Sequence, residues 1–300
     1  MNVKKTLLNI FKKNKSIYFV FNLLRTFFMR FLLTIKILIC KKENIKNDRE
    51  LIILGTGPSL KQDINKIVTN KNNYAYMVVN SFCLDSNFTL IKPEYYVLAD
   101  PAYYSEDAKG HGIKDRNFFL KMIKEKLNWK MTIVLPKVAR HSHLVQELSY
   151  NQFIKFDFIN GNTSYQPIIG NKFITYNRNI AMPKVQNVLH MCLYFGIYQK
   201  FSTIYLFGAD HNWCKDITVT DDNIVSIVEN HCYEYEHDKI HPMEKVDGSY
   251  WTMGELFEAW TIVYNGYYLL KSYADFNHVK IYNESAESFI DAFDRKSGRF

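Results

Sequence analysis

The residues best suited to chemistry lie in one short segment, Gly55-Thr56-Gly57-Pro58-Ser59. It follows an apolar run that predicts a buried strand, and a helix is expected to begin near Ser59. Gly55 and Gly57 permit positive φ and a close approach of backbone to ligand. Pro58 suits a first helical turn, Ser59 could cap the helix or bond a phosphate, and the helix N-terminus offers free N–H groups to an anion. Glycines of a plain tight turn would give the same pattern.

Three other expected strand ends carry polar or small residues. They are Asn80-Ser81, Asp100-Pro101, and the segment Gly208-Ala209-Asp210-His211-Asn212. Ligands of doubly wound sheets bind at the carboxyl ends of the strands, so these residues and the glycine loop should surround one site. His211 directly follows Asp210 and is expected to orient a neighbour more than to act as a base. Asp-Pro is also ordinary turn chemistry.

The elements that would position these residues alternate along the chain. Expected strands are Leu51 to Leu54, Tyr76 to Asn80, Tyr95 to Leu98, Thr132 to Leu135, Thr203 to Phe207 and Val279 to Tyr282, and expected helices include Ala181 to Phe195 and Met253 to Tyr273. This alternation predicts an α/β, Rossmann-like fold with a mostly parallel sheet and helices on both faces. Residues from about 214 to 252 are rich in charge and poor in periodicity, which predicts a lid or active-site insertion.

The segment before the first strand has a different composition. Residues 1–42 contain ten Lys or Arg and no Asp or Glu, whereas the whole chain has a net charge of +8, so the remainder is nearly neutral. Apolar residues recur among these cations at helical spacing, and the longest uncharged stretch, Ser16 to Leu24, is too short for a spanning helix. We therefore expect residues 1–45 to be a basic amphipathic segment on an anionic membrane surface, and residues 46–300 to form the α/β domain that carries the glycine loop. A helix packed on the protein's own core is the alternative.

Charge and cysteine usage exclude other classes. A nucleic-acid-binding domain carries its positive charge on the folded body, so no nucleic-acid partner is expected. The five cysteines show no CxxC pair, which favours free thiols in a reducing compartment. A zinc site built from Asp210, His211, His237 and His241 is an alternative that we disfavour, and we predict no metal site and no cofactor.

The glycine loop resembles the opening motif of the bacterial sialyltransferases that decorate lipooligosaccharides. The later strand ending in Gly208-Ala209-Asp210 resembles a second motif of that family. Both motifs also occur in motility-associated glycosyltransferases that handle nonulosonic acids and in hydroxymethylpterin diphosphokinase-like relatives. The resemblance covers roughly Leu51 to Asp294, and it implies a variant Rossmann-like transferase that uses a CMP-activated sugar without a metal.

The resemblance also implies roles for individual residues. The loop from Gly55 to Ser59 and Asn80 would bind the nucleotide, and Gly208, Ala209 and Asp210 would lie beside its cytidine and ribose. The family has Asn between the two glycines, where Thr56 stands here. A family Tyr that bonds the departing phosphate corresponds in place to Asn212 or Trp213, so Tyr233 or Tyr235 would replace it. The family's general base is a lid histidine, for which the candidates are His231, His237 and His241, with His241 favoured by its position before the long helix.

Two residues outside those motifs are further candidates. Arg178, in a polar run, could bind a carboxylate of donor or acceptor through its planar guanidinium, or form a surface salt bridge. Asp100 could contact a ligand as well as start a turn.

Together these features predict a peripheral glycosyltransferase on the cytoplasmic face of the inner membrane. It would transfer sialic acid or a related nonulosonic acid from a CMP donor to a glycolipid or glycan acceptor, with inversion. A neutral imidazole near pH 7 suits the proton transfer this requires. The alternatives are pyrophosphate transfer to a pterin, and a non-catalytic scaffold of polysaccharide assembly.

Overall fold

The computed structural model describes residues 15–39, 47–69, 73–106, 111–161, 170–184, 186–228, 240–245, 248–295, 297–298 and 300. The chain divides into two compact units. The smaller comprises Met1–Asn44 and Asn162–Met182, and the larger comprises Ile45–Gly161 and Pro183–Phe300. The larger unit carries the main sheet and the cavity described in the next subsection.

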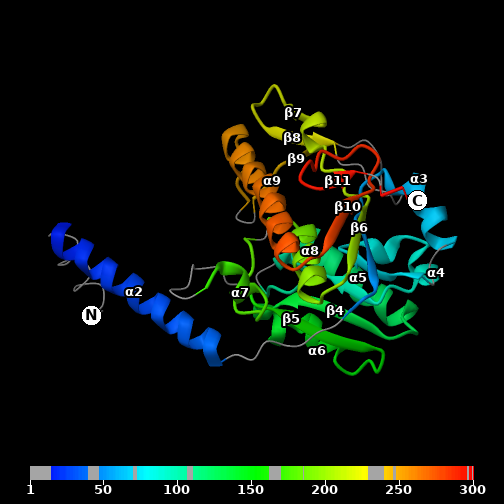
Figure 1. Cartoon of the computed structure of the whole chain (residues 1–300). Coiled ribbons are helices and arrows are strands. Elements are labelled where there is room, and N and C mark those ends of the chain that lie inside the picture. The colour runs from blue at the N-terminus through cyan, green and yellow to red at the C-terminus, as the bar shows by residue number, and fades with distance from the viewer. Residues whose placement is uncertain are drawn as a thin grey trace. The chain divides into compact units, whose positions relative to one another are not determined.

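The core of the larger unit is an eight-stranded sheet in which every strand pair is parallel (Figure 1). The strands are β1 (Glu50–Leu54), β2 (Ala75–Val79), β3 (Tyr95–Val97), β4 (Met131–Pro136), β5 (Ile154–Ile159), β6 (Thr203–Phe207), β10 (Lys280–Asn283) and β11 (Asp294–Arg295). Their order in space is β11-β10-β6-β1-β2-β3-β4-β5. The chain builds outward from β1 to β5 and then returns to the other side of β1. The order therefore reverses between β1 and β6, where open α/β sheets bind their ligands.

Helices pack on both faces of this sheet. On one face, Ile52 and Leu54 belong to a buried cluster with α3 (Leu60–Thr69), α4 (Phe88–Ile91), α5 (His111–Lys126) and α6 (His143–Leu148). On the other face, Gly196 of α8 (Val188–Tyr198) lies against Leu51 and Ile204. The long helix α9 (Met253–Phe276) packs in turn against α8. Short 3₁₀ turns complete the connections: η2 (Phe82–Leu84), η3 (Pro101–Tyr103), η4 (Lys137–His141) and η5 (Trp213–Lys215).

The predicted α/β fold is confirmed. Each of the six predicted strands begins and ends within one residue of an observed strand. The helix predicted from Ala181 is wrong at its start, because Pro183 disfavours helical backbone before it and Asn187 caps the helix at its true beginning. The side chain of Asn187 accepts from the amide of His190, 3.2 Å away. Strand β5 was not predicted. It lies at the edge of the sheet, where most of its side chains are partly exposed and the apolar signal is weak.

The region predicted as a lid contains a second, antiparallel sheet. Its strands are β7 (Ile217–Val219), β8 (Val225–Val228) and β9 (Ile240–Pro242). Ile227 on β8 is paired with His241 on β9. Residues 229–239, 246 and 247 lie outside the described residues. Movement of this region over the site stays a prediction.

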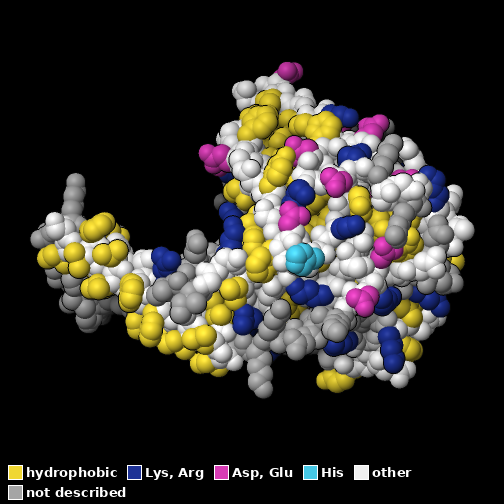
Figure 2. Space-filling view, in the orientation of Figure 1, with side chains coloured by type: hydrophobic (Ala, Val, Ile, Leu, Met, Phe, Trp, Pro, Cys, Tyr) yellow, Lys and Arg dark blue, Asp and Glu magenta, His cyan; other side chains and the backbone are white. Residues whose placement is uncertain are grey.

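The smaller unit contains α2 (Lys15–Ile39) and the short helix α7 (Lys172–Tyr176). The four charged residues of α2 are all basic, and most of its large apolar side chains are exposed to solvent, Phe19 at 68% and Phe27 at 64%. Figure 2 shows hydrophobic side chains along this helix with Lys and Arg among them. No helix in the described part of the chain is both long and apolar enough to cross a membrane. Membrane association of α2 stays a prediction.

The contact between α8 and α9 generates a test of the packing. A Cβ on Gly266 of α9 would lie 2.5 Å from Cε1 of His190, whose Nε2 is held 3.0 Å from the Val263 carbonyl. Gly266→Ala should therefore lower the free energy of unfolding by about 1–3 kcal/mol, measured by urea denaturation. In the same helix, a Cβ on Gly254 meets nothing within 4 Å. Gly254→Ala should leave stability unchanged or raise it by up to about 1 kcal/mol. Equal stabilities of the two variants would contradict this packing.

Candidate functional site

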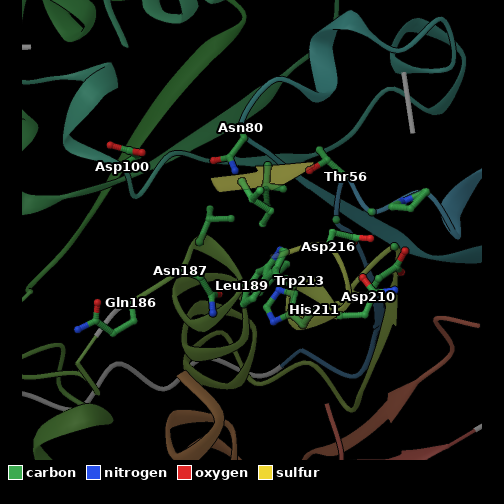
Figure 3. A pocket seen from close by; sticks show the side chains of 18 of the residues that line it. Thr56, Asn80, Asp100, Gln186, Asn187, Leu189, Asp210, His211, Trp213 and Asp216 are labelled. Atoms are coloured by element: carbon green, nitrogen blue, oxygen red, sulfur yellow. The ribbon is translucent and has the colours of Figure 1, made fainter. Parts of the chain in front are cut away.

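A cavity of about 830 Å³ opens at the carboxyl edge of the main sheet, at the switch point between β1 and β6. Its lining comes from the loops after β1, β2, β3 and β6, from the N-terminus of α8, and from the region predicted as a lid. The predicted site residues that line it are Gly55, Thr56, Gly57, Pro58, Asn80, Asp100, Gly208, Asp210, His211 and Asn212. In Figure 3, Asn80 and Asp100 lie across the cavity from Asn187, His211 and Trp213. The fold thus brings together the four strand ends that the sequence predicted.

The glycine loop is fastened to the end of β6. The amide of Gly55 donates to the Phe207 carbonyl at 2.8 Å, and the amide of Gly57 donates to the Gly208 carbonyl at 2.9 Å. A Cβ on Gly55 would lie 2.3 Å from the Gly208 oxygen, and one on Gly57 would lie 2.7 Å from the Asp210 carboxyl carbon. The absence of side chains at Gly55 and Gly57 is therefore needed for the packing of the two loops against each other, independently of any ligand. This agrees with the alternative of a plain tight turn.

The expectation of free amides at the start of α3 is wrong. Asp210 accepts from the Ser59 amide at 2.9 Å and also from the Ser59 hydroxyl. The amides of Leu60 and Lys61 donate to the carbonyls of Gly57 and Pro58. The protein's own carboxylate thus occupies the positive end of this helix, where a phosphate was expected. Ser59 is buried and does not line the cavity.

A second helix N-terminus, that of α8, does face the cavity. Gln186, Asn187, Val188 and Leu189 line it, and Asn187 caps the third amide of the helix. In the described part of the chain, the amides of Val188 and Leu189 have no acceptor. Sequence analysis missed this feature because it placed the start of the helix at Ala181. The signal was present as an Asn directly before an apolar run.

His211 combines burial with access to the cavity. Its side chain is 9% exposed, and its ring stacks on Trp213 with 4.2 Å between centroids. Its backbone adopts φ 50°, and its carbonyl accepts from the Tyr264 hydroxyl at 2.6 Å. Burial lowers the pKa of His211 from 6.5 to about 3, with a smaller contribution from His190, so the imidazole is neutral at physiological pH.

The two nitrogens of His211 have different surroundings. Nδ1 lies 3.1 Å from the Tyr267 hydroxyl, which in turn lies 3.4 Å from Oδ1 of Asn187. The Asn187 Nδ2 also lies 3.2 Å from this hydroxyl. When Tyr267 donates to Oδ1 of Asn187, it accepts from Nδ1–H of His211, and Nε2 is left as an acceptor. When Tyr267 accepts from Nδ2 of Asn187, it can donate to Nδ1, and Nε2 then carries the proton. The hydrogen bond of the ring to the described residues is made at Nδ1, and Nε2 makes none. This chain of contacts can hold the tautomer that a general base requires.

Asn80 and Asp100 lie on the opposite side of the cavity. Asn80 adopts φ 47° at the end of β2, and its Oδ1 is buried with no partner among the described residues. Its carbonyl accepts from the Tyr96 hydroxyl, which fixes the turn. The Asp100 carboxylate accepts from the Ala102 amide at 2.8 Å, as expected for an Asp-Pro turn, and also lines the cavity. Asn80 thus lines the cavity with a side-chain oxygen that is unsatisfied among the described residues.

The remaining predicted residues either do not line the cavity or lie outside the described residues. His241, the favoured base, is exposed on β9 and does not line the cavity, although its cross-strand neighbour Ile227 does. Ala209 is buried, with its amide donating to the Ser285 hydroxyl at 2.8 Å. Arg178 belongs to the smaller unit. Tyr233, together with Tyr235, His231 and His237, lies outside the described residues.

The charged side chains of the cavity are mostly acidic. Asp100, Asp210, Asp216 and Glu287 line it, with Lys215 as the basic residue among the described lining. Lys215 forms an ion pair with Glu287 at 3.4 Å. Among the described residues, no group of three or more His, Cys, Asp or Glu side chains is arranged to hold a metal ion. An anionic ligand would therefore depend on backbone amides more than on cationic side chains.

Comparison with known proteins places the chain among its relatives. A family model described as 6-hydroxymethylpterin diphosphokinase MptE-like matches residues 29–216, more than half of the chain. The protein belongs to the MptE-like family. The match includes the glycine loop, Asn80 and the Gly208–Asp210 segment, so the predicted kinship with hydroxymethylpterin diphosphokinase-like proteins is confirmed. The more specific resemblance to sialyltransferases stays a prediction.

This MptE-like chain is also similar to a solved structure of the MAf glycosyltransferase from Magnetospirillum magneticum AMB-1. The two share 12% sequence identity with a TM-score of 0.51, and the match covers 87% of this chain and 35% of the other. The chain thus spans about a third of that protein's length, and at this identity the likeness shows a shared fold. A search of curated proteins finds no match.

The two buried histidines generate a pH prediction. Burial lowers the pKa of His190 from 6.5 to about 4 and that of His211 to about 3. Below pH 6.5 the unfolded chain takes up two protons that the folded chain does not, so stability falls as pH is lowered toward 4. Between pH 6.5 and 5 each histidine should remove about 2 kcal/mol of unfolding free energy.

Urea denaturation at a series of pH values measures this loss. His211→Asn should remove roughly half of the decline, whereas His141→Gln, which replaces an exposed imidazole, should leave it unchanged. A free energy of unfolding that is flat between pH 7 and 5 would contradict the buried, neutral state of these rings.

Proposed function

We propose that this MptE-like protein is a membrane-associated glycosyltransferase. It transfers sialic acid or a related nonulosonic acid from a CMP-activated donor to a hydroxyl of a glycan or glycolipid acceptor, with inversion and without a metal. The observation that carries the proposal is His211, a neutral imidazole that lines the switch-point cavity and whose Nε2 forms no hydrogen bond to the described residues. The cavity's volume of about 830 Å³ lies within the range of about 300–1,000 Å³ typical of small-molecule sites.

The donor's nucleotide would lie along the ends of β1 and β2. Thr56 lines the cavity, and its amide has no acceptor among the described residues. The buried Oδ1 of Asn80 could accept from the cytosine amino group or from a ribose hydroxyl. The amides of Val188 and Leu189, at the positive end of α8, are better placed for the phosphate than α3, whose end Asp210 occupies.

The reaction needs one proton transfer and one departing group. The acceptor oxygen attacks the anomeric carbon and forms the new glycosidic bond, while the bond from that carbon to the phosphate oxygen of CMP breaks. Nε2 of His211 takes the hydroxyl proton, and CMP leaves with the bonding electron pair. Inversion follows because the displacement occurs in a single step, so no enzyme nucleophile is required.

The low pKa of His211 is compatible with this role. In the empty site burial disfavours the imidazolium. A bound donor places a phosphate and a sugar carboxylate nearby, and these charges favour the protonated ring. Proton uptake is thereby coupled to donor occupancy. The coupling also suits an acidic cavity, where the imidazolium would have carboxylates close by.

Association with a lipid surface completes the proposal. The cationic and apolar residues of α2 suit an anionic leaflet, with the cations near phosphates and the rings in the acyl boundary. A surface glycolipid acceptor would be concentrated there. We place the protein on the cytoplasmic face of the inner membrane.

Pyrophosphate transfer from ATP to a pterin is the second candidate. It is favoured by the description of the family and by the carboxylates of the cavity, of which Asp216 has no side-chain partner in the described part of the chain. Such carboxylates could bind the magnesium that accompanies ATP. The two candidates therefore differ in nucleotide and in metal dependence.

A thermal-shift screen of CMP, UDP, GDP and ATP, each with EDTA or with magnesium, separates the candidates. We expect CMP to raise the melting temperature with EDTA present, because ligand binding to the folded state stabilises it. Stabilisation by ATP only with magnesium would instead support pyrophosphate transfer. No stabilisation by CMP, together with no turnover of CMP-linked sialic, legionaminic, pseudaminic or Kdo donors, would exclude the proposed transferase.

Replacement of the two candidate bases provides a second test. His211→Asn should lower kcat for sugar transfer by about 10²–10⁴-fold while leaving CMP binding detectable, since the general base acts on the acceptor proton. His241→Asn, at an exposed position, is the matched control and should retain activity. The reverse pattern would assign the general base to His241. Wild-type activity in both variants would exclude both histidines as the base.

A further inference from the structure

A second cleft of about 670 Å³ lies beside the candidate site, and no step proposed above uses it. Its lining includes four aromatic side chains, Phe257, Trp260 and Tyr264 of α9 and Phe289 after β10. Phe257 is 53% exposed and Phe289 39%. We call this the aromatic cleft. Figure 2 shows hydrophobic side chains over the N-terminal part of α9 and the antiparallel sheet of β7, β8 and β9.

The aromatic cleft and the first cavity share a wall one segment thick. Along η5, Trp213 and Lys215 line the first cavity while Cys214 between them lines the cleft. After β10, Glu287 lines the first cavity and Ser288 the cleft. A ligand group in the cleft is therefore one layer of side chains away from the cavity that holds His211.

Stacked rings connect the two spaces. His211 stacks on Trp213, and Trp213 lies 6.3 Å from Trp260 between ring centroids, with the planes 27° apart. Tyr264 lines the cleft and also donates to the His211 carbonyl. The residues that position the candidate base thus also form the boundary of the cleft.

The polar groups of the cleft suit a neutral, hydroxylated ligand. Its described lining contains the Asp291 carboxylate, the Asn265 amide and three residues with a hydroxyl group, but no Lys or Arg. Asn265 has no side-chain hydrogen bond among the described residues. Lys215 lies 5.1 Å from the centroid of the Phe289 ring, but it is paired with Glu287, so a second nucleotide or phosphate is disfavoured. A pyranose ring presents C–H groups on one face, which pack on aromatic rings, and hydroxyls at its edge, which bond carboxylate and amide groups.

We propose that the aromatic cleft binds a sugar ring of the acceptor glycan and holds its hydroxyl toward His211. This inference rests on the proposed glycosyl transfer. The rings of Phe257 and Trp260 are perpendicular to each other, with centroids 5.7 Å apart, so each can pack against a different side of the sugar. Asp291 and Asn265 select for hydroxyl groups. The donor occupies the first cavity, and the sugar to be extended enters past Trp213.

Saturation-transfer NMR on the full chain tests the cleft without any donor. Irradiation of the protein's aromatic protons should transfer saturation to the ring protons of galactose, N-acetylglucosamine or lactose. Phe257→Ala should weaken binding of the responding sugar about fivefold or more, as expected for loss of one stacked ring. Phe276→Ala is the matched control, because Phe276 lies on the same helix, is similarly exposed at 43% and does not line the cleft.

The kinetic counterpart compares transfer with donor hydrolysis. Phe257→Ala should raise the acceptor KM about fivefold or more and leave hydrolysis of the CMP donor unchanged, because the donor does not touch this ring. No saturation transfer to any of the three sugars, or equal binding by the Phe257 and Phe276 variants, would overturn the proposal. A third outcome separates the two proposals. If sugar binding depends on Phe257 but the protein neither binds CMP nor turns over any CMP-linked sugar, the cleft is a saccharide site and the proposed transferase is rejected.

Discussion

The contact between the ends of β1 and β6 is the constraint on which the site depends. Asp210, at the end of one strand, binds the backbone amide and hydroxyl of Ser59 at the start of the helix that follows the other. Gly55 and Gly57 let the two loops approach to this distance. The two strands lie at the only reversal of strand order in the described sheet. The same contact therefore joins the two halves of the sheet and forms part of the cavity lining.

The position of His211 depends on a second contact, between α8 and α9. Gly266 allows α9 to lie against the ring of His190, and the next residue along α9, Tyr267, reaches both His211 and Asn187. Two neutral imidazoles are buried in this layer, and one nitrogen of each is held by a carbonyl or a hydroxyl, whereas Nδ1 of His190 has no partner among the described residues. Packing of the helices and protonation of the candidate base are therefore linked.

The two cavities divide the proposed reaction into separate tasks. The strand-end cavity offers backbone amides and a buried amide oxygen, groups suited to a nucleotide, whereas the aromatic cleft offers rings and uncharged hydrogen-bonding groups. Trp213 stands between them and stacks on His211. A base at this boundary is placed where an acceptor hydroxyl from one side would meet a donor carbon from the other.

The sequence by itself determined the fold class, the six predicted strands and the set of loops that meet at the cavity, because short apolar runs and glycine turns are local signals. Tertiary structure decided which groups are free. Asp210 occupies the helix end that the local pattern of Ser59 predicted to be open, and it lies 151 residues away along the chain. His211 rather than His241 lines the cavity for the same reason: burial and hydrogen-bond partners depend on elements distant in sequence, which local spacing does not encode.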